Sequence, residues 1–561
     1  MKTFFPLPNW LKTYPKAHLN QDILAGLIVG VIVIPQSLGY AMLSGLPPVY
    51  GLYSAIVPVL VYAWVGSSSV NAVGPVAITA IMTAQALAPF GNLPPDDYAR
   101  LASLLALMTG TFLWLASWFR LGWITQFISR GVTAGFISGA AILIFIGQIK
   151  FITNIPITGN TVLANGISFV RHLSDIHLPT LMVGGLAFLL LFGNRYYLAK
   201  ILPPKYQFFS KLMPLMVMIV AIIVSHFWQF DNLQIKIIGD IPQGLPQFVL
   251  PFSTSFLPMI FQLLPASALM ALVAFVSSDA VASSFARKRQ EIFYSNQELK
   301  GLGFANIIGA FFQSFTVVGG FSRTAVNVDA GATSPLASVL SVVVMAVCVL
   351  WFAPYLAPLP YAVLGANIMV AIVSLIDMTT FKKALVSDRL DALAFAVALI
   401  GVLVFGLNIG LVVGILVSFA GLIWQSSRPH IAIVGQVGNT GHFRNIHRHQ
   451  VNIDERLLII RIDESLFYGN AGSVRDFIGK AVQSRANCQN VVLMLSAVNH
   501  IDLTGQEMLI TLNQELAQQN ITLHLSEVKG PVMDLLQKTD VINTLSGKVF
   551  LSTVEAVDKL V

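Results

Sequence analysis

The chain from Asp22 to about Trp424 holds repeated apolar runs that are long enough to cross a lipid bilayer. A transmembrane helix needs roughly 20 consecutive apolar residues, because no water in the hydrocarbon can pair its backbone polar groups. Charged residues make up only 11% of the chain, whereas soluble proteins carry roughly 25%. The sequence therefore predicts a polytopic α-helical protein of the inner or plasma membrane.

We predict about fourteen spans, some of them short or broken. They begin near Asp22, Tyr50, Ser69, Tyr98, Phe127, Leu178, Leu212, Pro265, Leu299, Val317, Pro335, Pro360, Asp391 and Asn408. Basic residues gather in the loops that follow even-numbered spans, for example Arg287, Lys288 and Arg289, and the opposite loops are acidic or sparse. The positive-inside rule then puts both termini in the cytoplasm. It also explains the net charge of +7 without a nucleic-acid partner.

The third and tenth segments differ from ordinary spans, because each begins as an extended stretch and continues as a short helix. The third opens at Gly74–Pro75, and the tenth opens at Gly319–Gly320 before Ser322–Arg323. Interruptions of this kind at matching places in two halves point to a transporter site near the bilayer midplane. Seven segments separate the two, so the halves have opposite topology. The alternative is that Gly/Pro pairs merely kink two spanning helices.

Arg323 is the strongest candidate for anion binding. Its guanidinium keeps its charge, which costs at least ~3 kcal/mol near the midplane unless water or a counter-ion is present. In the first turn of a short helix it reinforces the positive end of the helix dipole. The third segment would direct a second helix N-terminus at the same point, forming an anion site with hydroxyls from Ser322 and Thr324. The alternative is a permanent ion pair with Asp279.

Two further polar groups lie inside predicted spans. Gln36 follows a proline in the first span, one turn before Tyr40, and its amide could bind an oxyanion or join two helices. Asp279 is the only acid of the eighth span. It could couple transport to H+ or Na+, with Ser277 lining the cavity beside it, or it could extend toward the cytoplasm near Arg287.

The chain changes character after Trp424 and follows an alternating strand–helix pattern. We expect strands at Leu457–Ile462, Asn490–Leu495 and Ile521–Leu525, and amphipathic helices at Ala471–Val482, Thr504–Gln518 and Pro531–Lys538. This alternation predicts a small α/β domain. The expected division is a cytoplasmic N-terminal segment (1–21), a membrane domain (22–427) and a cytoplasmic domain (428–561). No cofactor or metal is expected, and the two cysteines form no ligand cluster.

The stretch Ile34–Ile78, IPQSLGYAMLSGLPPVYGLYSAIVPVLVYAWVGSSSVNAVGPVAI, closely resembles the first signature of the sulfate permease family. Ser295–Asn327, SNQELKGLGFANIIGAFFQSFTVVGGFSRTAVN, resembles its second block, and the C-terminal part is similar to a STAS domain. The resemblance implies a uracil-permease-like fold of two inverted seven-helix repeats. Segments one to four and eight to eleven would form a core, and the other segments a gate. It also implies a homodimer, elevator-like movement, and substrate-site positions at Gln36, Val76, Ala77, Ser322 and Arg323.

Two positions bear on coupling and regulation. Ion-coupled members of the family typically carry an acid where this chain has Ser277, so either Asp279 replaces that acid or coupling differs. The phosphorylatable motif of STAS-domain antagonists reads Asp502-Leu503-Thr504-Gly505 here. Thr504 could accept a phosphate, or it could simply be an N-cap. The STAS domain could also bind cytoplasmic protein partners.

The expected function is secondary active transport of small anions, with sulfate first and bicarbonate, chloride or dicarboxylates also open. Symport with H+ or Na+ and anion exchange both fit. The alternatives are an anion channel or motor-like member of the same family, and a nucleobase permease of the same fold. An enzyme is not expected, because no nucleophile–histidine pair or metal-ligand cluster lies in the spans.

Overall fold

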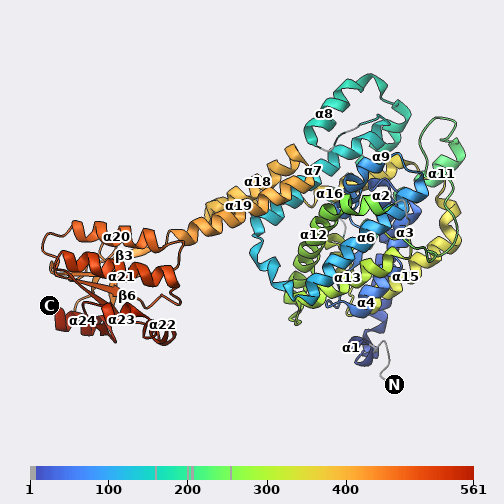
Figure 1. The fold of residues 1–561 in the computed structure, drawn as a ribbon. Helices are drawn as coiled ribbons and strands as arrows, with labels where there is room; N and C mark the ends of the chain where they lie inside the picture. The colour runs from blue at the N-terminus through green and yellow to red at the C-terminus, as the bar shows by residue number, and fades with distance from the viewer. Residues whose placement is uncertain are drawn as a thin grey trace. The chain divides into compact units, whose positions relative to one another are not determined.

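The computed structural model describes residues 8–157, 159, 161–198, 201, 203, 207–252 and 256–561. Residues 1–7 of the predicted N-terminal segment lie outside this set. The chain divides into two compact units, Met1–Ser418, called here the membrane unit, and Phe419–Val561, called the C-terminal unit. The first unit is helical and the second contains a sheet (Figure 1).

The helices between residues 8 and 427 follow the predicted segments closely, and the last of them, α19, includes the boundary between the two units. They are α1 (Asn9–Lys12), α2 (Leu19–Leu43), α3 (Val49–Ser54), α4 (Val57–Val65), α5 (Ala77–Leu87), α6 (Pro95–Trp118), α7 (Arg130–Thr153), α8 (Val162–Arg171), α9 (Leu178–Gly193), α11 (Gln207–Trp228), α12 (Leu257–Arg289), α13 (Ser295–Ala310), α14 (Phe321–Asp329), α15 (Leu336–Val347), α16 (Tyr361–Val373), α17 (Met378–Ser387), α18 (Arg389–Phe405) and α19 (Leu407–Ser427). By length and composition, eight helical runs among the described residues can cross a membrane, and shorter apolar helices accompany them. The short helices α8 and α17 were not predicted.

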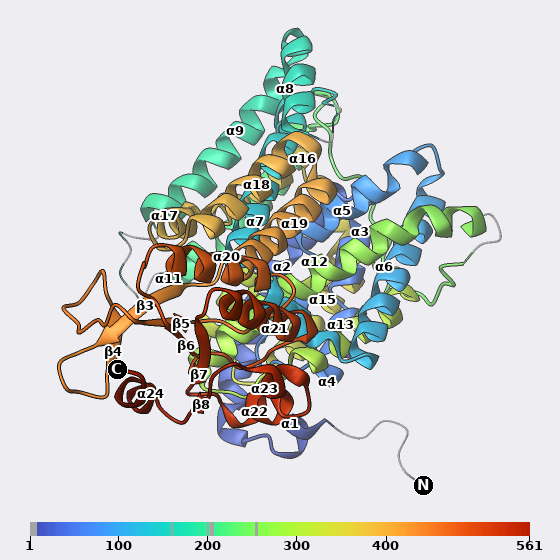
Figure 2. The same ribbon diagram turned by 60° about the vertical axis from the view of Figure 1, so that its left-hand side comes forward.

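The membrane helices pack in two groups. The first, called here the core group, contains α2–α6 and α12–α15; within it α6 packs along α13, and α2 packs along α15. The second, called the gate group, contains α7, α9, α11 and α16–α18; within it α7 packs along α18 (Figure 2). Glycines allow the close approaches. A Cβ at Gly110 of α6 would lie 2.7 Å from the backbone nitrogen of Ile307, and one at Gly135 of α7 would lie 2.3 Å from the carbonyl oxygen of Phe395. Small residues at these crossings let backbones touch, as is usual in membrane proteins.

Two very short strands meet inside the core group, and their pairing is called here the crossing of β1 and β2. β1 (Val73–Gly74) pairs antiparallel with β2 (Val318–Gly319), so that Val73 faces Gly319 and Gly74 faces Val318. Each strand leads within three residues into a short helix, α5 after β1 and α14 after β2. The prediction that the third and tenth segments are extended stretches turning into short helices is confirmed.

The C-terminal unit is built on one sheet, with strand order β4-β3-β5-β6-β7-β8. The elements are β3 (Ile431–Gln436), β4 (Phe443–Asn445), β5 (Leu457–Ile462), α20 (Ala471–Gln483), β6 (Asn490–Met494), α21 (Leu503–Gln518), β7 (Thr522–Ser526), α22 (Gly530–Leu536), α23 (Asp540–Thr544), β8 (Val549–Phe550) and α24 (Thr553–Leu560). β5 to β8 are parallel. Both faces of β5 are buried, Leu458 and Ile460 against α20 and α21, and Leu457 and Ile459 on the face of α24. This burial explains the continuous apolar run that predicted the strand.

Candidate functional site

The N-termini of α5 and α14 lie beside the crossing of β1 and β2. Val76 and Gly320 are the N-cap residues, and neither cap position supplies a side-chain hydrogen bond in the described structure. The first N–H groups of a helix have no intrahelical partner and carry part of the positive end of its dipole. Both helix starts therefore present donors that suit an anion or water.

A cavity of about 860 Å³ reaches these helix starts. Residues of the core group and of the gate group both line it; Arg130, Thr133 and Lys383 come from the gate group. The lining brings together the following residues singled out from the sequence: Gln36, Tyr40, Val76, Ala77, Ser277, Asp279, Ser322 and Arg323. Residues from four distant stretches of the chain thus meet at one wall of the cavity.

Arg323 is the third residue of α14 and is only 6% exposed. Its Nη1 donates to the carbonyl oxygen of Val73 at 3.2 Å, and its Nη2 donates to that of Pro75 at 2.7 Å. Its Nε has no partner in the described part of the chain. The guanidinium therefore joins the second half of the chain to the backbone of the first and keeps its charge at the cavity wall. The alternative of a permanent Arg323–Asp279 ion pair is wrong, because carbonyl groups hold the guanidinium.

Gly74 makes this arrangement possible. Its φ is +155°, and a Cβ built there would lie 1.9 Å from Nη1 of Arg323. Any side chain would occupy the space of the guanidinium and would also disfavour the backbone conformation. The glycine of the Gly74–Pro75 pair is therefore required by a contact between the two halves of the chain.

Thr324 lies behind the crossing and does not line the cavity. Its side chain is fully buried, its hydroxyl accepts from the N–H of Ala72 at 3.0 Å, and it donates to Oδ1 of Asn71 at 3.1 Å. The expectation that this hydroxyl faces the anion is corrected by its position. Ser322 and Thr324 are two residues apart, about 200° around a helix, so they face opposite ways.

Asp279 lies in α12 and is 8% exposed at the cavity wall. The hydroxyls of Thr125 and Ser295 are within hydrogen-bonding reach of its carboxylate, and Arg287 is near enough to act on it electrostatically. Its Oδ1 has no partner among the described residues. The position is compatible with both interpretations of Asp279, ion coupling at the cavity and a location close to Arg287, because the side chain lines the cavity and Arg287 is nearby.

In the C-terminal unit, Thr504 is exposed in the first turn of α21. The N-cap of this helix is Asp502, whose carboxylate accepts from the N–H of Gly505 at 2.8 Å. The interpretation of Thr504 as the N-cap is therefore wrong. The Thr504 side chain is exposed at the surface, next to the N-terminus of α21, which Asp502 caps.

Two buried residues behind the site, Glu298 and Asn71, were not predicted from the sequence. Glu298 is 0% exposed and accepts hydrogen bonds from four side chains, one of them Asn71. Asn71 in turn contacts Thr324. The available signal was an acidic residue in α13, within the second block that resembles the family, but its partners come from positions far apart in the sequence.

Comparisons with known proteins agree with this picture. The family model for the sulfate permease family matches residues 19–398, and the STAS domain model matches residues 448–556. Sulfate transporter 4.1, chloroplastic, of Arabidopsis thaliana is 32% identical over 97% of this chain and 80% of its own length. Sulfate transporter 3.1 of the same plant is 31% identical over 100% and 87%.

Solved structures show the same fold. The murine Solute Carrier 26 family member A9 anion transporter in the inward-facing state gives a TM-score of 0.87 at 24% identity, covering 99% of this chain and 93% of that one. The transmembrane domain of a cyanobacterium bicarbonate transporter, BicA, gives 0.59 at 21% identity, covering 72% and 98%. The predicted fold class, a polytopic helical membrane domain with a C-terminal STAS domain, is confirmed. From its sequence and its fold, the chain belongs to the sulfate permease family.

Proposed function

We propose that this protein carries out secondary active transport of small anions, with sulfate as the first candidate. The observation that carries the proposal is the meeting of two uncapped helix N-termini and the charge of Arg323 at one cavity wall. Each helix start contributes roughly half a positive charge. Relatives named as sulfate transporters support sulfate, and the family favours transport over catalysis.

The donors at the site suit an anion better than a nucleobase. Gln36, Ser322 and the N–H groups after Val76 can all donate hydrogen bonds to oxyanion oxygens. Nucleobase permeases of the same fold typically place an acid in the eighth and in the tenth segment to accept from a ring N–H, and the start of α14 carries Arg323 instead. Bicarbonate, chloride and dicarboxylates use the same donors as sulfate, so a panel of anions must separate them.

The two helix groups support an elevator-like alternating-access mechanism. Each group packs mainly on itself, and the cavity lies between them. Movement of the core group past the gate group would carry the crossing of β1 and β2 across the membrane. Arg130, Arg287 and Lys383 line the same cavity, so by the positive-inside rule it opens to the cytoplasm. An anion channel or a motor-like protein would share this site.

Several finer features belong to the same proposal. Both termini would be cytoplasmic in the cell or inner membrane, with boundaries at 1–21, 22–427 and 428–561. The transporter would be a homodimer, and its STAS domain would bind cytoplasmic proteins. Asp279 would couple transport to H+ or Na+ unless the protein is an exchanger, and exposed Thr504 would be available for phosphorylation.

Uptake into proteoliposomes tests the proposal. Purified protein should accumulate labelled sulfate with saturable kinetics, and unlabelled anions inside the vesicles should accelerate uptake by counter-transport. Imposed pH and sodium gradients separate symport from exchange. Non-saturable flux without counter-transport would instead favour a channel, and no flux of any anion would refute the proposal.

A further inference from the structure

The carboxylate of Glu298, in α13, is fully buried behind the crossing of β1 and β2. Oε2 accepts from the hydroxyl of Tyr62 at 2.7 Å and from that of Ser67 at 2.6 Å. Oε1 accepts from Ser278 Oγ at 2.6 Å and from Asn71 Nδ2 at 3.0 Å. These partners come from α4, from the loop before β1 and from α12, so one carboxylate ties three parts of the core group together.

The hydrogen bonds of this network run in one direction. The N–H of Ala72 donates to Thr324 Oγ1, and the Thr324 hydroxyl donates to Asn71 Oδ1. This orients the Asn71 amide with Nδ2 toward Glu298. The chain of hydrogen bonds therefore starts at the backbone N–H of Ala72, just before β1, and ends at the carboxylate of Glu298, which accepts the last bond. Hydrogen bonds aligned in one direction reinforce one another.

The network also touches the second strand. A Cβ at Gly319 of β2 would lie 2.5 Å from Ser278 Oγ and 2.6 Å from both amide atoms of Asn71. The side chains that Glu298 holds thus press directly against β2 and hydrogen-bond next to β1. Both strands lead into the half-helices whose N-termini line the cavity.

We propose that Glu298 is a positioning residue of the anion site, which holds β1 and the start of α5 in place through Asn71 and Thr324. Glu298 is not among the described residues that line the cavity. The effect on anion binding rests on the proposed function. The support that Glu298 gives to β1 does not, because it is a property of the fold.

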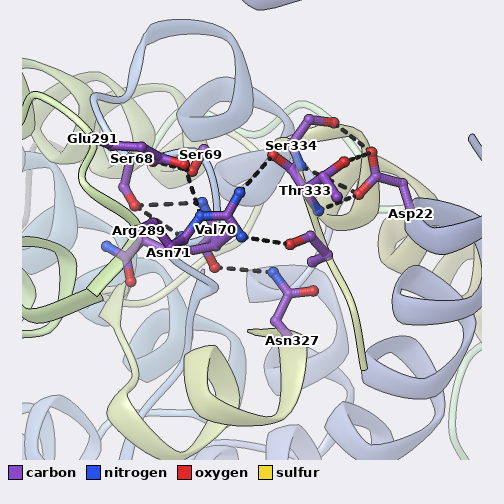
Figure 3. A network of polar contacts seen from close by, with 11 residues as sticks. Asp22, Ser68, Ser69, Val70, Asn71, Arg289, Glu291, Asn327, Thr333 and Ser334 are labelled. Carbon is purple, nitrogen blue, oxygen red and sulfur yellow. Dashed lines mark hydrogen bonds and ion pairs between the residues drawn. The ribbon is translucent and has the colours of Figure 1, made fainter. Parts of the chain in front are cut away.

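Asp22 provides a matched control. It too is a fully buried carboxylate surrounded by donors, namely Tyr14, Thr333 and Ser334. Figure 3 shows it facing Thr333 and Ser334, with Arg289 on the other side of these two residues, where its guanidinium contacts Glu291 and the carbonyl oxygen of Thr333. Asp22 fastens the start of α2 to the turn after α14, and the contacts described for its carboxylate do not include β1.

The test compares three variants of the full-length protein in detergent: Glu298→Gln, Thr324→Val and Asp22→Asn. Glutamine keeps the shape but puts a donor where the carboxylate accepts, and valine removes the hydroxyl that links Asn71 to Ala72. Hydrogen exchange measured without added anion should rise by about tenfold in residues 70–77 for the first two variants, because each loses a hydrogen bond of the network. In Asp22→Asn the rise should fall in residues 331–336 instead.

Sulfate binding is measured on the same samples. Glu298→Gln and Thr324→Val should each weaken sulfate binding by about tenfold, and the double variant should be no weaker than the stronger single effect, because both act through one chain of contacts. Asp22→Asn should keep the wild-type affinity. Unchanged exchange at residues 70–77 in both Glu298→Gln and Thr324→Val overturns the inference. Wild-type protein that binds no anion refutes the proposed function, and the exchange data still decide the role of Glu298.

Discussion

Replacing Gly74 by alanine tests how the two halves of the chain share Arg323. The new Cβ would lie 1.9 Å from Nη1 of Arg323, far inside contact distance, so the guanidinium must leave the carbonyl groups of Val73 and Pro75. Hydrogen bonds to a charged group contribute about 1.5–3 kcal/mol each. Loss of both costs about 3–6 kcal/mol on the same basis.

Only part of this free energy appears as lost anion affinity, because the displaced guanidinium finds other partners or water. If the equivalent of one hydrogen bond is lost, the sulfate Kd rises by roughly 10- to 150-fold. The measurement is equilibrium binding of labelled sulfate to purified protein, with thermal unfolding recorded in parallel. We expect the affinity to fall while the unfolding transition stays cooperative.

Gly244→Ala is the matched control. Gly244 also has a positive φ, +131°, but a Cβ there meets no atom within 4 Å. This variant therefore carries the backbone strain of alanine at positive φ without the clash. Wild-type sulfate affinity in Gly74→Ala would refute the reasoning, and so would an equal loss in Gly244→Ala, since strain alone would then explain the effect.

The remaining predictions concern charge, coupling, domain division and pH. Arg323→Ala should abolish concentrative uptake in proteoliposomes yet leave a folded protein with the oligomeric state of the wild type by size-exclusion chromatography; wild-type uptake would refute the anion site. Asp279→Asn should turn gradient-driven accumulation into exchange or facilitated flux with binding kept, and unchanged accumulation under a pH gradient would make Asp279 structural. Deletion from Pro429 should leave sulfate binding intact, and complete loss in a correctly inserted protein would place the tail in the site. Burial, and to a smaller extent the charge of Lys548, lower the pKa of His524 below its ordinary value of 6.5. The unfolded chain therefore binds a proton at a higher pH than the folded chain, so the free energy of unfolding of residues 428–561, measured with urea, should fall as the pH drops below about 6.5. His524→Gln should remove this loss of stability.

The membrane architecture could be predicted because its determinants are local. The Gly74–Pro75 and Gly319–Gly320 pairs interrupt apolar runs at matching places in the two halves, and this match made the two half-helices visible in the sequence. The strand β5 was predicted for the same reason, from an uninterrupted apolar run. By contrast, β4 and β8 contain three and two residues and have no pattern long enough to detect.

The contacts of the site could not be predicted in the same way. The bonds of Arg323 to Val73 and Pro75 join residues about 250 positions apart, and nothing local indicates them. Thr324 is a different case, because helix geometry alone puts it opposite Ser322. That error was avoidable. The contacts of Glu298 could not be predicted, because they depend on where α4 and α12 lie in the fold.

The two half-helices start in the same way, each after a short strand, but they differ in chemistry, and this difference explains how their starts are held together. The first turn of α5 reads Ala77-Ile78-Thr79, with no charged residue, whereas that of α14 reads Phe321-Ser322-Arg323. Two positive helix ends placed together repel each other, and a third charge from arginine adds to the repulsion. Arg323 offsets this by donating to carbonyl groups of the opposite half, which places partial negative charge beside the guanidinium. In the proposed transporter, an arriving anion would complete a site whose positive charges are already held in position, so its binding would need little reorganisation.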